Sequence, residues 1–388
     1  MSDFKAKFYT NVNDIESKHW ESLACGSNVY YTPEFLNAFE IANSDIEFNY
    51  ILIFKNDEPV AFANTQIVTI GVETITKNIK ISEGIKGFIN RSLRNKHIRV
   101  LFCGNVFLSG EYGTFLKQGE DKITTFKAIA EAVKELSLNT KRLNAIFIKD
   151  FEDDSLFITN HLHDYDYSSM HVEPNMIIHL DPSWQNFDQF KNDLKSKYRV
   201  KANKADRDGA LLVTKRFDKN DIIYFKKDLQ ELYENTIANA NFNAQILNLN
   251  TYIHLKSQYG DHFIVQGYFL EDKLVGFLSA MQNQDHLDAH FIGLDYSLNK
   301  EYAIYPRILN DYVRIGIECK ATQINLGRTA SEIKSTLGAV PEELTCYIRH
   351  KRKFPNKLMK PFIKNVKIKS FKQHKPFKTK KETVNTVS

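Results

Sequence analysis

The chain has 388 residues and a mass of 45.0 kDa, and its 43% hydrophobic and 26% charged residues exclude a disordered or fibrous protein. No apolar run approaches the ~18 residues of a membrane helix, and the start MSDFKAKFYTN lacks a signal-peptide core, so we expect a cytoplasmic protein. The net charge of +5 is unevenly distributed: 13 Lys and Arg and one acid follow from His350 onward, which leaves −7 on the preceding 349 residues.

The first predicted elements form a simple series. Thr32-Pro33 predicts a helix start, with Thr32 as N-cap and Pro33 in the first helical position. A strand hairpin begins at Phe48 and turns at Asp57. A strand at IRVLFCGN, a helix within DKITTFKAIAEAVKELSL and a strand at LNAIFIKD complete the series.

The same series returns in the second half. The pattern predicts one helix from about Trp184 to Asp208, stopped by Gly209. The next hairpin matches the first at an offset of 215 residues, as Phe54 matches Phe269. A strand at HLDAHFIGL, a helix within AIYPRILNDYVRIGIECK and a strand at TQINLG follow.

The repeated order predicts an α/β (α+β) fold of two tandem domains, each a mixed, mostly antiparallel sheet flanked by helices. We assign the domains to residues 1–165 and 166–350, followed by a basic C-terminal tail at 351–388. The boundary lies in a polar, proline-terminated stretch from His161 to Asn175, which we expect to be a linker.

This layout resembles two GNAT acetyltransferase domains in one chain, the arrangement of the FemAB-like acyl and aminoacyl transferases. The stretch NLGRTASEIKSTLG is similar to the family's strand end and short Lys-bearing helix, and LKSKYRVKANKADRDG to the basic helix that opens the second domain. The resemblance implies transfer of an acetyl or aminoacyl group to an amine of a small polar metabolite or cell-envelope precursor, as in peptidoglycan biosynthesis. It implies acyl-coenzyme A as co-substrate in preference to aminoacyl-tRNA, with no tightly bound cofactor.

One departure supports a different interpretation. The family's glycine-rich loop, whose backbone amides hold the coenzyme A pyrophosphate, is absent from GLDYSLNKEYAIYPRI. The alternative is a non-catalytic GNAT-fold binding protein that docks on a membrane or on RNA through its basic tail.

Arg328, Thr329 and Lys334 form the first candidate site. Thr329-Ala-Ser-Glu332 fits a capping box, so we expect a helix N-terminus that favours an anion, with Arg328 beside it and Lys334 turned toward the cleft. Alternatively, Glu332 only caps the helix and pairs with Arg328. Tyr198 and Arg199 are expected to bind from the opposite wall, unless their helix only presents a solvated charged face.

His286, Asp288 and His290 alternate along a predicted strand and so share one face. We expect Asp288 or His290 to act as a base in a substrate cleft, with Lys334 as the third catalytic candidate; edge exposure or satisfied hydrogen bonds are the alternative. A metal site here would need a ligand besides these three residues, and the sequence identifies none. Cys103 is expected to be a buried thiol, because no base is visible beside it.

Residues 351–381 interleave lysines with phenylalanines. This pattern predicts contact with an anionic membrane surface or with RNA phosphates, and hence a peripheral membrane location for a cytoplasmic protein. The alternative is a disordered, solubilising tail.

Overall fold

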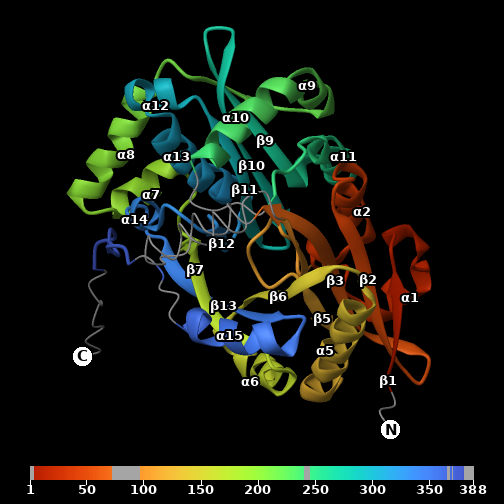
Figure 1. The fold of residues 1–388 in the computed structure, drawn as a ribbon. Helices are drawn as coiled ribbons and strands as arrows, with labels where there is room; N and C mark the ends of the chain where they lie inside the picture. The colour runs from red at the N-terminus through yellow and green to blue at the C-terminus, as the bar shows by residue number, and fades with distance from the viewer. Residues whose placement is uncertain (1–3, 72–96, 240–244, 365–367, 369, 380–388) are drawn as a thin grey trace, which may run out of the picture.

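The computed structural model describes residues 4–71, 97–239, 245–364, 368 and 370–379 (Figure 1). Its strands form one 13-stranded mixed sheet in the order β1-β2-β3-β4-β6-β13-β7-β12-β11-β10-β9-β8, with β5 beside β3. Within these ranges, none of the helices combines the length and the apolarity needed to cross a bilayer.

The first half builds one end of the sheet. Helices α1 and α2 cover one face and α5 the other, because alternate residues of β2 and β3 pack into different hydrophobic clusters. Thr32 caps α2 and Pro33 is its first residue, as predicted. The elements are β1 (Phe4–Tyr9), α1 (Ser17–Leu23), α2 (Pro33–Ala42), β2 (Glu47–Lys55), β3 (Glu58–Gly71), β4 (His97–Cys103), β5 (Thr114–Leu116), α5 (Lys122–Asn139), β6 (Leu143–Phe151) and α6 (Leu156–Thr159).

The second half repeats this order, and the predicted hairpin, strand, helix and strand are confirmed. In both halves the strand after the hairpin pairs in parallel with the strand that follows the next long helix, β4 with β6 and β11 with β12. The elements are α7 (Phe187–Asp193), α8 (Ser196–Asp208), β8 (Val213–Arg216), α9 (Lys219–Tyr224), α10 (Lys226–Ala238), α11 (Asn250–Tyr259), β9 (Phe263–Leu270), β10 (Lys273–Asn283), β11 (His286–Leu294), α12 (Tyr296–Tyr302), α13 (Ile304–Glu318), β12 (Gln323–Asn325) and α14 (Ser331–Ser335).

The predicted helix from Trp184 to Asp208 is wrong in one respect, because it is two helices, α7 and α8. Leu194 lies between them with an extended backbone and is fully buried. It forms a β-bridge with Phe377 from the end of the chain. A tertiary contact therefore interrupts a segment whose local pattern favours a continuous helix.

The last strands of the two halves are exchanged. β7 (Ser168–His179) lies between β12 and β13, and β13 (Val340–His350) lies between β7 and β6. β7 follows the elements of the first half, although the predicted boundary assigns it to the second, and pairs with β12, whereas β13 crosses to pair with β6 of the first half (Figure 1). The expected linker from His161 to Asn175 contains most of a central strand, and the division at residues 165 and 166 stays a prediction.

A hydrophobic cluster shared by the halves joins them further. It unites Phe35 of α2 with Tyr252 of α11 and Phe277 of β10. A second cluster lies under α5, and a third lies under α13, α7 and α8.

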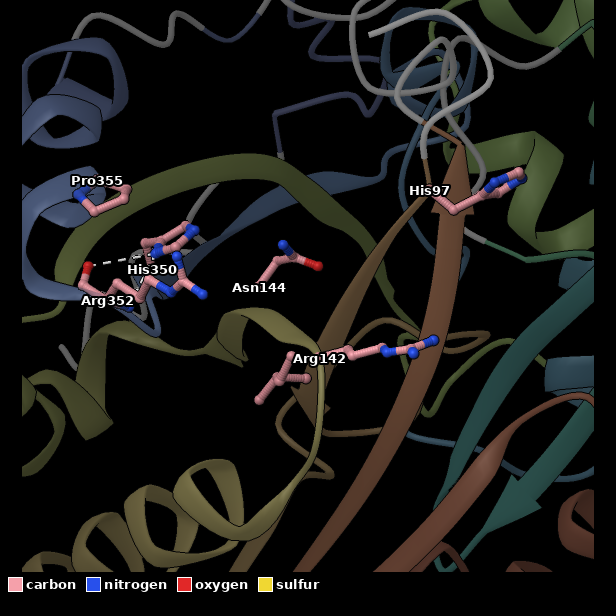
Figure 2. Close-up of a pocket in the computed structure, with 7 residues that line it drawn as sticks. His97, Arg142, Asn144, His350, Arg352 and Pro355 are labelled. Atoms are coloured by element: carbon pink, nitrogen blue, oxygen red, sulfur yellow. Dashed lines mark hydrogen bonds between the residues drawn. The ribbon is translucent and has the colours of Figure 1, made fainter.

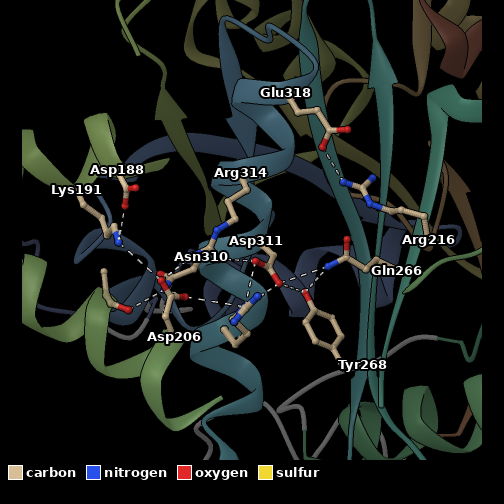
Figure 3. A network of polar contacts seen from close by, with 12 residues as sticks. Asp188, Lys191, Asp206, Arg216, Gln266, Tyr268, Asn310, Asp311, Arg314 and Glu318 are labelled. Atoms are coloured by element: carbon tan, nitrogen blue, oxygen red, sulfur yellow. Dashed lines mark hydrogen bonds and ion pairs between the residues drawn. The ribbon is translucent and has the colours of Figure 1, made fainter. Parts of the chain in front are cut away.

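A polar network ties α13 to its surroundings (Figure 3). Asp311, which is 3% exposed, accepts hydrogen bonds from the Tyr268 hydroxyl at 2.8 Å and from Arg314 at 2.5 Å. Arg314 also pairs with Asp206 of α8 at 2.6 Å. These contacts satisfy the buried charges, so the network has a structural role.

The C-terminal tail is ordered at residues 370–379, so the alternative of a disordered, solubilising tail is wrong for this segment. The Phe377 ring stacks on Trp184 at 5.4 Å and meets Phe190 edge-on. Pro376 and Asp193 accept backbone hydrogen bonds that fix the segment against α7 and α8. Before this segment, α15 (Lys353–Lys364) packs beside β7 and β13.

Candidate functional site at the junction of the halves

The two parallel strand pairs part at equivalent places. β11 and β12 are paired only from His286 with Gln323 to Asp288 with Asn325. β4 and β6 part after Cys103 and Ile148. Beyond these points the described residues of each strand pair form no further ladder pairs with one another, so the polar groups there are candidates for a ligand site.

In the first half, Lys149 fills the space where the strands part. Its Nζ donates to the carbonyl oxygens of Asn105 at 2.9 Å and Leu108 at 2.5 Å, and pairs with Asp150 at 2.6 Å. A Cβ at Gly104 would lie 2.6 Å from its Cγ. The chain itself therefore occupies this position in the first half.

In the second half, a three-residue polar group lies where the strands part. The Tyr30 hydroxyl donates to Asp288 Oδ2 at 2.8 Å and lies 3.1 Å from His290 Nε2. Because the hydroxyl proton is on the bond to Asp288, His290 Nε2–H must donate to the Tyr30 oxygen. Tyr30 belongs to a short 3-10 helix, Val29–Tyr31, whose Val29 amide donates to Asn283 of β10 at 3.0 Å. The first half thus supplies one member of the group.

Burial sets the protonation of these side chains. It raises the pKa of Asp288 to about 6, although hydrogen bonds from Tyr30 and Asn325 act in the opposite direction. Burial also lowers the pKa of His290 to about 3, so this imidazole is neutral near pH 7. Asp288 is therefore better suited than His290 to accept a proton, and His290 is better placed to orient Tyr30.

Three further carboxyls gather near Asp288. Burial, and then the charges of Glu152, Asp288 and Glu111, raise the pKa of Glu342 to about 7. Burial raises the pKa of Glu111 to about 7 as well, and it raises that of Glu152. We call Glu111, Glu152, Asp288 and Glu342 the junction cluster.

The sheet register explains part of this gathering. Asp288 pairs with Asn325, Asn325 with Ile177, and Glu342 with Asn175, so their side chains share one face. Leu287 points to the opposite face, toward α13. Asn175 is 1% exposed, and its Oδ1 accepts from Ser109, but its Nδ2 has no partner in the described part of the chain.

Arg328 is the cation beside this face. It pairs with the fully buried Asp150 of the first half, which also binds Lys149. The Cys346 Sγ lies 3.3 Å from the same carboxylate. The buried Arg328 Nε has no hydrogen-bond partner among the described residues. Arg328 therefore links the halves and pairs with Asp150, not with Glu332.

Lys334 does not face the cleft as expected. It is 5% exposed, and its Nζ donates to the carbonyl oxygens that follow β12, those of Leu326 at 2.8 Å, Gly327 at 3.0 Å and Arg328 at 2.7 Å. Burial lowers its pKa to about 7. Lys334 thus holds the loop that carries Arg328, and its catalytic role stays a prediction.

The predicted capping box is also wrong. Thr329 has a φ of +65° and Ala330 a φ of +50°, so α14 begins only at Ser331 and without a side-chain cap. Glu332 lies 3.4 Å from His374 instead. The left-handed turn comes directly after the three carbonyl groups that accept hydrogen bonds from Lys334, and the local sequence does not reveal these contacts.

Tyr198 and Arg199 lie apart from the junction cluster. The Tyr198 hydroxyl is 3.1 Å from His374 Nδ1, and its ring packs on the α13 face of the sheet, opposite to Asp288. Arg199 is half-buried, and no ion pair holds it within the described ranges. The structure therefore brings Asp288 and His290 together through Tyr30, holds Arg328 on Asp150, and places Tyr198 on the opposite face of the sheet.

Other residues at the junction carried little sequence signal. Tyr30, Glu111, Tyr112 and Glu342 come from distant segments, and only the two acids of Val340-Pro-Glu-Glu within a strand are unusual. Tyr112 stacks on Tyr30 with ring centroids 4.0 Å apart. Cys103 is buried as predicted, and burial raises the pKa of its thiol to about 12.

No protein-family model matches the chain, and no curated protein matches it. Several solved structures, in contrast, align with most of the chain. FemX aligns with a TM-score of 0.53 at 12% identity, over 88% of this chain and 96% of FemX. A tandem GNAT protein from the clavulanic acid biosynthesis pathway aligns with a TM-score of 0.53 at 8% identity, over 90% and 99%. L-PGS from Bacillus licheniformis aligns with a TM-score of 0.51 at 11% identity, over 90% and 96%. Together with the two parted strand pairs, these alignments show that the chain has the tandem GNAT fold of FemX.

Proposed function

We propose that the protein is an N-acyltransferase whose site is the junction cluster with Tyr30 and His290. The observation that carries the proposal is the position of Asp288. This carboxyl lies where β11 and β12 part, contacts a tyrosine from the first half, and has a pKa of about 6. A general base works best when its pKa lies near the operating pH.

The chemistry needs a deprotonated amine. The acceptor enters as an ammonium ion, which the acidic junction cluster attracts, and gives one proton to Asp288 or Glu342. The amine nitrogen then attacks the acyl carbonyl carbon, a C–N bond forms, and the bond to the donor's sulfur or oxygen breaks. The nitrogen then loses a second proton, which passes to the leaving thiolate or alkoxide, and the proton held by the carboxyl is released to water, so the carboxylate is regenerated.

Two unpartnered donors are suited to the developing negative charge. Asn175 Nδ2 and Arg328 Nε are buried and lack hydrogen-bond partners in the described part of the chain. A buried donor without a partner costs roughly 1–3 kcal/mol. We infer that the acyl oxygen accepts these hydrogen bonds in the transition state.

The choice of donor and acceptor extends the proposal. The resemblance to FemAB-like transferases favours a polar amine, such as a cell-envelope precursor, as acceptor. Acyl-coenzyme A is the first donor to test, because the resemblance favours it. Aminoacyl-tRNA is the second, because Tyr296–Tyr302 follows β11 in place of the glycine-rich loop that would hold a coenzyme A pyrophosphate. A non-catalytic binding protein would bind one of these donors without transfer.

A donor panel followed by turnover tests the proposal. A donor at 100 times its Kd should add ~2.7 kcal/mol to the free energy of unfolding. With that donor and a panel of amines, mass spectrometry should detect acylated product. Asp288→Asn should lower kcat about 100-fold or more, and Tyr30→Phe should shift the pH profile of kcat.

The matched control is Glu318→Gln, which changes an exposed carboxyl that pairs with Arg216 far from the site. It should leave turnover unchanged. Turnover that survives both Asp288→Asn and Glu342→Gln would contradict the role of the junction cluster. Binding of a donor without any product would favour the non-catalytic interpretation.

A further inference from the structure

Helix α15 carries an exposed apolar stripe. Phe354, Leu358 and Phe362 are 74%, 56% and 61% exposed. They are spaced four residues apart, so they follow one side of the helix over successive turns. Monomeric proteins seldom leave such large side chains together in water without a partner.

The other side of α15 fixes the helix on the body of the protein. Asn356 is 1% exposed, accepts a hydrogen bond from the His350 amide and donates to the Asp166 carbonyl, both at 2.8 Å. Ile363 is 7% exposed, and Lys360 pairs with Asp166 at 2.5 Å. The stripe therefore points outward because of folding and not because the tail is unfolded.

The surroundings of the stripe are basic. From Lys353 to Lys364 the helix contains no acidic residue. Lys353 and Lys357 are exposed beside the stripe. A helix with an apolar side and flanking lysines is suited to the boundary between lipid headgroups and acyl chains.

A pocket of about 420 Å³ opens next to this helix (Figure 2). Pro355 of α15 is one of its walls, and the others are His97, Arg142, Leu143, Asn144, His350 and Arg352. The lining has two arginines, two histidines and no acid. Neither arginine has a carboxylate partner within the described ranges. The pocket is thus suited to a phosphate ester.

We propose that the stripe and the pocket together form a docking surface for a bilayer that contains anionic phospholipid. The stripe enters the acyl-chain boundary, and a lipid phosphodiester occupies the pocket between Arg142 and Arg352. Nucleic acid would account for the cations but not for three exposed apolar side chains at helical spacing, so the structure favours the membrane.

Docking would leave the candidate site accessible. The pocket lies at the amino ends of β4 and β6, at His97 and Leu143, whereas the strands part near their carboxyl ends. The helix is about 18 Å long and would lie in the plane of the interface. This proposal does not depend on the acyl transfer proposed above.

Vesicle flotation tests it, with phosphatidylcholine vesicles that contain or lack phosphatidylglycerol. The protein should bind only the anionic vesicles. F354S/L358S/F362S and R142Q/R352Q should each weaken that binding about tenfold or more. The control L211S/V213S/Y224S removes three other exposed apolar side chains, which are 68%, 63% and 80% exposed, and should bind like the unchanged protein.

All the substituted side chains of the stripe are exposed, so the melting temperatures should stay unchanged. If the triple variant melts early, F354S alone replaces it in the flotation assay. Vesicle binding that is indifferent to the stripe substitutions would overturn the proposal. An RNA that binds as tightly as the vesicles, and that needs the two arginines but not the stripe, would show a nucleic-acid surface instead and would overturn it as well.

Discussion

Buried carboxyls set the pH response of the junction at the scale of single residues. The pKa values of Glu111 and Glu342 rise from 4.5 to about 7 in the folded protein, mainly through burial. The folded state therefore holds more protons than the unfolded state between these values. It follows that the free energy of unfolding falls as the pH rises from about 4.5 to about 7.

Glu342→Gln should remove part of that fall. The variant keeps the shape of the side chain but no longer loses a proton, so its stability should depend less on pH. Urea unfolding at several pH values across this window measures the difference. Glu318→Gln, at an exposed position, should leave the pH dependence as it is. An equally steep fall in the Glu342 variant would contradict the assigned pKa shift.

Lys334 shows how a single residue can mislead a sequence-based interpretation. A lysine one turn into a helix suggests a cation that faces a ligand. Its Nζ instead binds three backbone carbonyls, so the charge organises the loop after β12. The residue still serves the proposed site, because that loop carries Arg328 to Asp150.

At the scale of elements, the end of the chain acts as part of the second half. Phe377 fills a space between Trp184, Phe190 and Gly338, and a Cβ at Gly338 would lie 2.2 Å from its ring. Phe377→Ala should lower the free energy of unfolding by about 2–4 kcal/mol, because it leaves a cavity beside α7. Chemical denaturation measures the loss.

Phe354→Ala is the matched control in the same basic tail. Its side chain is 74% exposed, so the change should have little effect on stability. Equal stability losses in the two variants would contradict the division of the tail into a packed segment and an exposed stripe.

The spacing of apolar residues predicted most elements correctly, because apolar residues recur every two residues in hairpin strands and every three to four residues in amphipathic helices. It failed at two particular places. Leu194 leaves the helical pattern because Phe377 pairs with it, and β7 is a strand although its first residues are polar. In both cases a partner far away in the sequence decided the conformation.

At the scale of the whole molecule, the pairing of β13 with β6 should make residues 1–165 dependent on the rest of the chain. Residues 1–165 alone would lose β13 from the edge of β6 and would expose the hydrophobic cluster around Phe35. We expect that this fragment does not unfold cooperatively by itself. Mixing it with residues 166–388 should restore a single cooperative transition, detectable by circular dichroism.

A cooperative melt of residues 1–165 alone would contradict this expectation and would support the predicted boundary as a true domain limit. If the two fragments form a complex that does not bind the acyl donor, the proposed site would be wrong although the two fragments associate as expected.

The sequence by itself determined the order of the elements, the repeat, the basic tail and the face shared by Asp288 and His290, because these depend on spacings between near neighbours. Only the tertiary structure decided which side chains meet. Tyr30 reaches Asp288 across 258 residues, and Arg328 reaches Asp150 across 178. Such contacts arise from strand exchange and a shared core, and their free energy depends on the whole packed sheet, which no local pattern encodes.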